Sequence, residues 1–183
     1  MVYKQMLKYV MSIILNYMTQ NETSLERGAH IAVEGNVAGI EYYHHGIFLG
    51  HTIGVADFGG NDVSDAKPRI VDIYRFTEEG KRKLYCIKYH PKQCLPPEQT
   101  ARLAEEVVEH PSIWGPYDVI ENNCEHFATR CKLGVAISKQ IQEHIRQCLA
   151  NPKVMLAHIV GLASVSPFLF YHGHRFRSPC TLL

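Results

Sequence analysis

The order of its segments constrains the fold of this chain most strongly, because the strand-like segments of the central part precede the helix-like ones. Residues 27–50 alternate apolar with smaller or polar residues, and positions 41–49 are rich in aromatic and β-branched side chains. Two further strand candidates cover residues 69–76 and 83–89, with a predicted hairpin turn at 77–81 between them. Strands followed by helices predict an α+β fold, an antiparallel β-sheet packed with helices.

The first helix predicted after the strands follows them directly. Pro96 and Pro97 mark its start, and His110 followed by Pro111 marks its end. Apolar residues at positions 103, 104, 107 and 108 recur at helical spacing between these signals. This stripe is expected to be buried against the sheet.

A cysteine at the start of the second predicted helix is the first candidate for chemistry. Cys124 follows Asn123, a typical N-cap residue, and precedes a helix-like segment at 125–133 that ends before Gly134. The helix dipole and the unpaired N–H groups of the first turn favour a thiolate there. A thiolate is the reactive form, so Cys124 is a candidate nucleophile. The alternative is a small buried apolar residue without reactivity.

A nucleophilic thiol needs a base, and the chain has 11 histidines. His44 and His45 differ from the others because they fall within a predicted strand, where only one of the two can face the Cys124 helix. A third polar group would orient the imidazole from the next strand or turn. Asp57 is the best placed candidate, and His51 is the second.

Two separated motifs together resemble the lecithin:retinol acyltransferase (LRAT) family, which includes the phospholipase A/acyltransferases. They are His-His-Gly-Ile-Phe-Leu-Gly at residues 44–50 and Asn-Cys-Glu-His-Phe at residues 123–127. The likeness extends over about residues 28–134, including the helix at 102–108 and Tyr117. This family is related to the NlpC-type papain-like fold by circular permutation, so the resemblance implies a circularly permuted papain-like domain.

The resemblance also implies roles for individual residues. Cys124 is the expected nucleophile, and His44, the first histidine of its motif, is the expected general base. The family usually has a histidine as the third member, in a Val-x-His setting, whereas the matching stretch here ends in Asp57. A carboxylate can orient an imidazole and stabilise its cation, so a Cys-His-Asp triad is expected.

Four further residues are expected to support the oxyanion site and the nucleophile: Asn123, Glu125, His126 and Tyr117. Backbone N–H groups at the start of the helix would stabilise the oxyanion. Glu125 would favour the helix N-terminus electrostatically, and His126 would pack beside the site.

A metal site is the competing interpretation of these motifs. Cys124, His126 and the pair His44 and His45 supply four zinc-binding groups. Structural zinc sites usually have tighter paired spacings, and a metal would quench the thiolate. We expect no metal and no other cofactor.

The chain is expected to divide into three parts. An amphipathic helix is predicted within residues 1–26, an LRAT-like catalytic domain at 27–140, and a helical apolar tail at 141–183. In the first part, apolar residues at positions 6, 7, 10, 11, 13, 14, 17 and 18 follow a helical stripe. This helix either packs on the domain or lies in a membrane interface.

The tail bears on membrane attachment. Residues 154–171 are mostly apolar, and as a helix they would span about 27 Å against a hydrocarbon core of ~30 Å. His158 and Pro167 weaken a spanning helix, so a helix docked on the domain is the alternative. The final Cys180-Thr-Leu-Leu fits a C-a-a-X box near basic residues, which makes Cys180 a candidate lipid-attachment site unless the match is chance. The tail is thus a candidate membrane anchor.

Composition bounds the partners and the compartment. A net charge of +1 gives no global reason to expect a nucleic-acid partner. The six cysteines include no C-x-x-C pair, which favours free thiols in a reducing compartment. We therefore expect a cytoplasmic protein associated with a membrane surface.

The function implied by the resemblance is that of a thiol-dependent acyltransferase or phospholipase A. A glycerophospholipid would donate the acyl group to Cys124, and water, an amine or a hydroxyl would accept it. Two alternatives stay open. One is a cysteine peptidase or amidase that uses the same dyad. The other is a non-catalytic interaction protein that retains the fold, which Asp57 favours if it mispositions His44.

Overall fold

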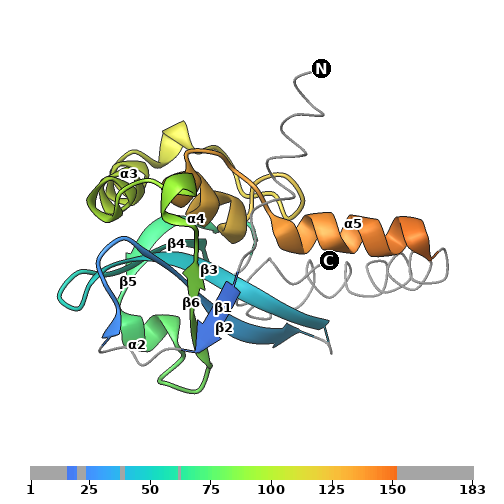
Figure 1. The fold of residues 1–183 in the computed structure, drawn as a ribbon, viewed down its shortest axis with the longest axis horizontal. Coiled ribbons are helices and arrows are strands. Elements are labelled where there is room, and N and C mark those ends of the chain that lie inside the picture. Colours follow the sequence, from blue (N-terminus) through green and yellow to red (C-terminus); the bar gives the residue numbers. More distant parts are fainter. Residues whose placement is uncertain (1–15, 20–23, 38–39, 62, 152–183) are drawn as a thin grey trace.

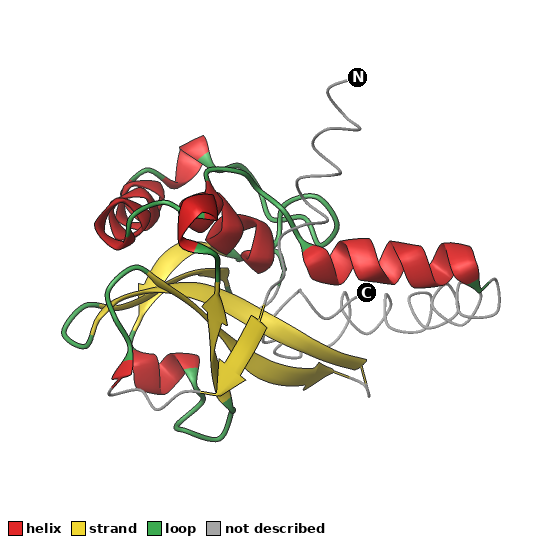
Figure 2. Ribbon diagram, viewed as in Figure 1, coloured by secondary structure: helices red, strands yellow, loops and turns green. Residues whose placement is uncertain are grey.

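The computed structural model describes residues 16–19, 24–37, 40–61 and 63–151. Within them, six strands form one antiparallel sheet in the order β1-β6-β2-β3-β4-β5. The strands are β1 (Asn16–Thr19), β2 (Ala29–Val37), β3 (Ile40–Gly50), β4 (Gly54–Gly59), β5 (Lys67–Val71) and β6 (Leu84–Lys88). The helices are α2 (Ile73–Phe76), α3 (Pro97–Glu109), α4 (Cys124–Leu133) and α5 (Lys139–Ala150), with short 3₁₀ helices at Pro91–Gln93 and Pro111–Ile113. The predicted α+β class is confirmed (Figure 2), while the permuted papain-like arrangement stays a prediction.

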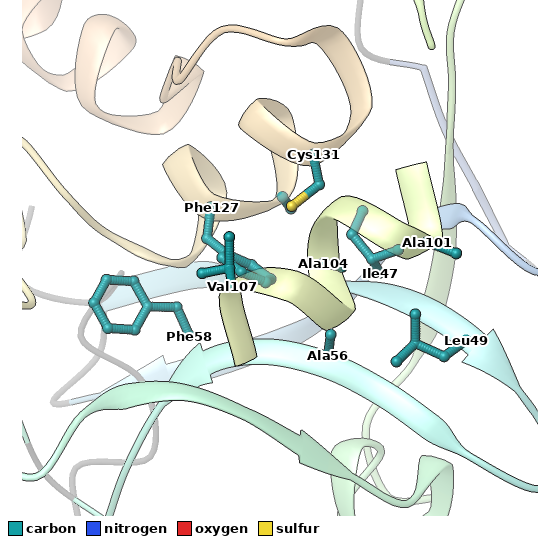
Figure 3. Packing of buried hydrophobic residues seen from close by; sticks show 10 residues of the cluster. Ile47, Leu49, Ala56, Phe58, Ala101, Ala104, Val107, Phe127 and Cys131 are labelled. Carbon is teal, nitrogen blue, oxygen red and sulfur yellow. The ribbon is translucent and has the colours of Figure 1, made fainter. Parts of the chain in front are cut away.

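Helices α3 and α4 cover one face of the sheet, and the short α2 lies on the other side (Figure 1). A hydrophobic cluster lies on each face of the sheet. Alternate residues of β3 contribute to one cluster or the other, because successive strand side chains point to opposite faces. Ile47 and Leu49 pack towards α3 and α4, whereas Phe48 packs on the side of α2. Figure 3 shows the larger cluster, whose buried members are Ile47, Leu49, Ala56, Phe58, Ala101, Ala104, Val107, Phe127, Ala128 and Cys131.

The two helices on this face begin and end where the sequence predicts. Helix α3 has Pro97 as its first residue and His110 as its C-cap, and Ala104 and Val107 of its predicted stripe are buried. Helix α4 has Asn123 as its N-cap and ends at Gly134, which adopts the left-handed conformation at φ 76° that glycine tolerates best. Local sequence signals therefore set both helices, prolines at the start of α3 and capping residues at both ends of α4.

The strand predicted at 69–76 is wrong in its second half. β5 ends at Val71, and Asp72 then caps α2 by accepting a 2.7 Å hydrogen bond from the backbone N–H of Arg75. The hairpin predicted at 77–81 is also wrong, because β5 pairs with β4 at one edge of the sheet while β6 pairs with β1 and β2. The N-cap at Asp72 and the distant pairing of β6 together override the local turn signal.

The amphipathic helix predicted within residues 1–26 is wrong where the structure describes it. Tyr17 and Met18 lie in β1 and pair with Ile87 and Cys86 of β6. The four residue pairs between β1 and β6 satisfy backbone groups along β6 that would otherwise be exposed at a sheet edge. The earlier part of the expected helix lies outside the described residues.

Helix α5 crosses the boundary expected at residues 140 and 141. Ser138 caps it by accepting a hydrogen bond from the backbone N–H of Ile141, and its first turn packs on the domain through buried Ile141. Figure 1 shows its far end extending away from the sheet. No helix among the described residues is long and apolar enough to cross a membrane. The apolar segment 154–171 and Cys180 lie outside those residues.

Candidate active site

The N-terminus of α4 is built by a reciprocal capping arrangement. The side-chain oxygen of Asn123 accepts hydrogen bonds from the backbone N–H groups of Glu125 (3.0 Å) and His126 (3.1 Å). The His126 Nδ1 in turn accepts from the backbone N–H of Asn123 at 3.3 Å. Asn123 also donates to the Val119 carbonyl at 2.8 Å, which ties the preceding loop to the helix. This arrangement makes Cys124 the first residue of the helix.

Cys124 is fully buried against β3. Its sulfur lies 3.9 Å from the carbonyl oxygen of Tyr43, the residue before His44, and its side chain packs with Tyr42. The nucleophile predicted from the sequence thus lies beside the strand that carries the predicted base.

The expected state of the thiols needs one correction. Cys86, Cys94 and Cys131 are free, as predicted, but Cys124 is in a disulfide. A disulfide needs two cysteines whose Cβ atoms lie about 4 Å apart, and linear spacing does not reveal that proximity. A thiolate at Cys124 therefore requires its reduction.

His44 and Asp57 form a buried pair on neighbouring strands. The Nε2 of His44 lies 2.7 Å from Oδ2 of Asp57, and the side chains are 6 % and 1 % exposed. In the register of β3 and β4, Asp57 lies opposite Gly46, so His44 is its diagonal neighbour on the same face. The structure thus brings the predicted base together with the predicted third member.

Asp57 carries its charge in spite of its burial. Burial by itself raises the pKa of this carboxyl, but the hydrogen bond and charge of His44 and the charge and hydrogen bonds of Arg69 outweigh it. The pKa of Asp57 therefore lies below its ordinary value. An ionised carboxylate only accepts, so Nε2 of His44 must donate, and in the neutral form of the ring Nδ1 then carries the lone pair.

His45 points to the opposite side of β3, towards a chain of buried and half-buried polar groups. Its Nδ1 lies 2.8 Å from Nε2 of His30, and the other His30 nitrogen lies 2.6 Å from the Tyr89 hydroxyl. Its Nε2 lies 3.2 Å from Nε2 of Gln140 in α5. Burial lowers the pKa of His45 to about 4, so its ring is neutral near pH 7. The two histidines are separated as strand alternation predicts, and His44 is the one bonded to a carboxylate.

Glu125 links α4 to the start of α5. Its Oε2 accepts from the Ser138 hydroxyl at 2.6 Å and from the backbone N–H of Gln140 at 3.1 Å. Its Oε1 is buried and has no hydrogen-bond partner among the described residues. Glu125 lies in the first turn as expected, but it also fixes the position of α5, which the sequence does not predict.

Tyr117 is linked to the backbone of Cys124 and lies within electrostatic reach of Asp57. Burial raises the pKa of its phenol, although the backbone N–H of Cys124 donates to its oxygen and opposes this rise. The charge of Asp57 adds to the increase, and the ring packs on Phe58 at a centroid distance of 4.7 Å. With Glu125 and His126 already donating to Asn123, the first three backbone N–H groups of α4 have partners inside the protein.

A cleft of about 630 Å³ opens onto His44 and Asp57. Its wall includes Phe76 of α2, and it carries charges of both signs. The charged residues around it are Arg69, Arg75 and Arg82, with Asp57, Asp72, Glu78 and Glu79. A ligand in this cleft would meet the His44 ring from the side of α2.

The histidine side chains considered as zinc ligands make other contacts in the structure. His126 caps α4, and His44 and His45 bond to Asp57 and to His30. Over the described part of the chain, no three or more His, Cys, Asp or Glu side chains are arranged to hold a metal ion.

Two residues of the site were missed by sequence reasoning. Arg69 reaches both carboxylate oxygens of Asp57, and the Gln140 amide pairs with the backbone of Tyr43. A buried carboxylate needs a cation or several donors, so a basic residue in the next predicted strand was a usable signal for Arg69. No local signal marks Gln140.

Comparison with known proteins gives one family and several partial relatives. The sequence matches the lecithin retinol acyltransferase family model over residues 23–137, which contain His44, Asp57 and Cys124. Human lecithin retinol acyltransferase (Homo sapiens) is 36% identical over 78 residues, covering 40% of this chain and 32% of that protein. Egg-laying defective protein 26 of Caenorhabditis elegans is 26% identical over 141 residues, covering 67% of this chain and 43% of that protein. The chain therefore spans about a third of the length of the lecithin retinol acyltransferases that it matches. No solved structure matches.

Proposed function

The chain belongs to the lecithin retinol acyltransferase family, and from this premise we propose that it is a thiol-dependent acyltransferase or phospholipase A acting on glycerophospholipid acyl esters. The observation that carries the proposal is the buried pair of His44 and Asp57, 2.7 Å apart, together with the approach of the Cys124 sulfur to within 3.9 Å of the carbonyl oxygen of Tyr43, the residue before His44. The acyl donor, the membrane surface as the place of reaction and the catalytic roles are parts of this proposal.

In the first half of the reaction, the reduced thiol of Cys124 transfers its proton to Nδ1 of His44. The thiolate attacks the ester carbonyl and forms a tetrahedral intermediate. When this collapses, the C–O bond breaks, His44 returns the proton to the departing lysophospholipid oxygen, and an acyl thioester remains on Cys124. Asp57 holds the imidazole through Nε2 and stabilises its cation.

In the second half, an acceptor attacks the thioester. His44 removes a proton from water, an amine or a hydroxyl, and the acyl group leaves the sulfur for that acceptor. Exclusion of water from the cleft would decide between hydrolysis and transfer. Association with a cytoplasmic membrane surface, with lipid attachment at Cys180, would deliver the lipid to the cleft.

The oxyanion needs donors that are not already committed elsewhere. The backbone N–H of Cys124 donates to Tyr117, and those of Glu125 and His126 donate to Asn123. The Tyr117 hydroxyl accepts from the backbone of Cys124, so its own proton can point to a developing negative charge next to the sulfur. We therefore assign the Tyr117 hydroxyl as the oxyanion donor, in place of the backbone N–H groups in the first turn of α4.

The contact between His44 and Asp57 also bears on the non-catalytic alternative. That alternative depends on Asp57 mispositioning His44, and a 2.7 Å hydrogen bond between two buried side chains supports the catalytic role instead. The cysteine peptidase alternative uses the same dyad and is separated only by its substrate.

The test is mass spectrometry of the intact, reduced protein after incubation with phosphatidylcholine vesicles. The expected result is a hydroxylamine-sensitive acyl adduct on the wild type that is absent from Cys124→Ala and His44→Ala. Cys131→Ala, which removes a second buried thiol from α4, is the matched control and should keep the adduct. No adduct and no lipid hydrolysis by the folded, reduced protein would refute the proposal, and cleavage of peptide substrates would move it to the peptidase class.

A further inference from the structure

Arg69 lies directly opposite Asp57 in the pairing of β4 with β5. Side chains directly opposite in an antiparallel pair lie on the same face of the sheet. The Nε of Arg69 donates to Oδ1 of Asp57 at 2.9 Å, and one terminal nitrogen donates to Oδ2 at 3.3 Å. The carboxylate is therefore held by a two-pronged arginine contact on one side and by His44 on the other.

The backbone of β4 leaves room for these three side chains to meet. A Cβ placed at Gly59 would lie 3.2 Å from a terminal nitrogen of Arg69, 3.3 Å from Cε1 of His44 and 3.4 Å from Oδ2 of Asp57. Strand residues two apart share a face, so Gly59 and Asp57 are on the same side of β4. Glycine at this position lets the guanidinium, the carboxylate and the imidazole converge.

We propose that Arg69 is a positioning residue for the proposed reaction. It fixes the Asp57 carboxylate in the orientation that holds His44, and its positive charge offsets the negative charge of the carboxylate. This inference rests on the proposed function for its kinetic consequences. The family resemblance assigns no role to this position. Arg69 acts through Asp57, and the structure shows no hydrogen bond from it to the His44 ring.

The burial of the pair makes this assistance necessary. The Asp57 side chain is 1 % exposed, whereas that of Arg69 is 25 % exposed. A carboxylate removed from water in this way requires hydrogen bonds and a counter-charge, while the partly hydrated guanidinium loses less solvation. Removing the arginine would leave His44 alone to balance the buried negative charge.

The charges around His44 give the sign of the effect. Asp57 contacts the ring directly, Tyr117 of the loop before α4 lies within electrostatic reach of Asp57, and His45 follows in β3. The other charged groups of the cleft are Arg75, Arg82, Asp72, Glu78 and Glu79. Without Arg69, the potential at His44 becomes more negative, which stabilises the imidazolium. The ring then accepts a proton from solvent at higher pH and loses its function as a base there.

The experiment measures the titration of the His44 ring by NMR and the pH profile of kcat/KM for the wild type, Arg69→Gln and Arg69→Lys under reducing conditions. The His44 signal is identified by its absence from His44→Gln. In Arg69→Gln, the titration midpoint and the acid limb should both move upward by about one pH unit. In Arg69→Lys, the charge is kept and the two-pronged contact is lost. The acid limb of the pH profile should therefore stay at the wild-type pH, while kcat falls and KM changes little.

Two further variants separate this role from a structural one. Arg75→Gln removes another arginine from the same cleft, one without a hydrogen bond to Asp57, and should leave the limb in place. Asp57→Asn with Arg69→Lys should lose no more kcat than Asp57→Asn alone, because the lysine change acts only through the carboxylate. Thermal melts identify any variant that fails to fold. If Arg69→Gln does not fold, the expected fall of kcat in folded Arg69→Lys still tests the inference.

An unchanged His44 midpoint in a folded Arg69→Gln protein would overturn the inference. Failure of the proposed function gives a different result, namely no acyl adduct and no lipid turnover in the wild type. The NMR midpoint is independent of turnover, so it would still decide whether Arg69 acts on His44 through Asp57.

Discussion

Gln140, in the first turn of α5, forms two hydrogen bonds with the backbone of Tyr43 in β3. The amide oxygen accepts from the Tyr43 N–H at 2.8 Å, and the amide nitrogen donates to its carbonyl at 3.1 Å. Strand β4 pairs with β3 only from Gly46 onwards, so this side chain takes the place of a strand beyond the end of β4. The same carbonyl lies 3.9 Å from the sulfur of Cys124. A helix outside the matched region therefore fixes the backbone next to the proposed nucleophile.

Replacing Gln140 with alanine should weaken both stability and turnover. The change leaves backbone groups of Tyr43 and one oxygen of Glu125 with fewer partners, which costs about 2 kcal/mol of unfolding free energy. Lipid turnover should fall because the backbone beside Cys124 is less well held. Chemical denaturation and the vesicle assay measure the two effects. Gln142→Ala, an exposed change on the same helix, is the control and should alter neither.

Tyr117→Phe should remove the proposed oxyanion donor and leave the fold intact. Loss of one such donor costs about 10²-fold in kcat. The change should act on kcat and leave KM nearly unchanged, because the donor bonds the charge that develops during attack. Tyr74→Phe, which removes an exposed phenol from the rim of the same cleft, should have no comparable effect. Equal kinetics for Tyr117→Phe and the wild type would assign the oxyanion site elsewhere.

Gly59→Ala should lower activity more than stability. The added methyl group approaches Arg69, His44 and Asp57 at 3.2–3.4 Å, so at least one of these side chains must shift by a few tenths of an ångström. We expect a fall of about tenfold in kcat/KM, since catalytic groups tolerate little misplacement. Lys67→Ala, an exposed change at the residue opposite Gly59 in β5, should be neutral. A variant with wild-type kinetics would show that the three side chains have space to spare.

The buried histidines His30 and His45 should make stability depend on pH. Burial lowers the pKa of His45 from 6.5 to about 4 and that of His30 well below 6.5. Both rings are therefore neutral in the folded protein while the unfolded chain takes up protons, so the unfolded state binds more protons below pH 6.5. This contribution is present above pH 6.5 and is lost as the pH falls towards 4. For His45 alone it amounts to about 3 kcal/mol.

The measurement for this prediction is urea unfolding at several pH values between 7 and 5. Stability should fall steadily over this interval, and His45→Gln should show a shallower decline. His51→Gln, at an exposed histidine, should keep the wild-type slope. Asp57 adds a loss of its own only at lower pH, because its pKa lies below its ordinary value of 3.8. A stability that is constant from pH 7 to pH 5 would contradict the prediction.

The limits of sequence reasoning are clearest on the strand side of the fold. The alternation of His44 and His45 predicts that the two rings face opposite sides, and they do. The segment at 69–76 is predicted as one strand, yet it divides at Asp72 into β5 and α2. The same segment contains Arg69, whose importance depends on which strand it pairs with. A basic residue in this predicted strand was a usable signal for a partner of Asp57. The register that brings Arg69 opposite Asp57 leaves no local mark, so the contact itself could not be predicted.

The sequence by itself determined the α+β class, the start of α3 at Pro97, the caps of α4 at Asn123 and Gly134, and the two motifs that identify the family. These properties depend on local periodicity, on capping and on residue identity, which neighbours in the chain specify. Only the tertiary structure decided that Arg69 meets Asp57, that Gln140 completes the edge of β3, and that Cys124 is oxidised. Those contacts join separate elements across strand register and helix packing, and their geometry exists only once the chain has folded.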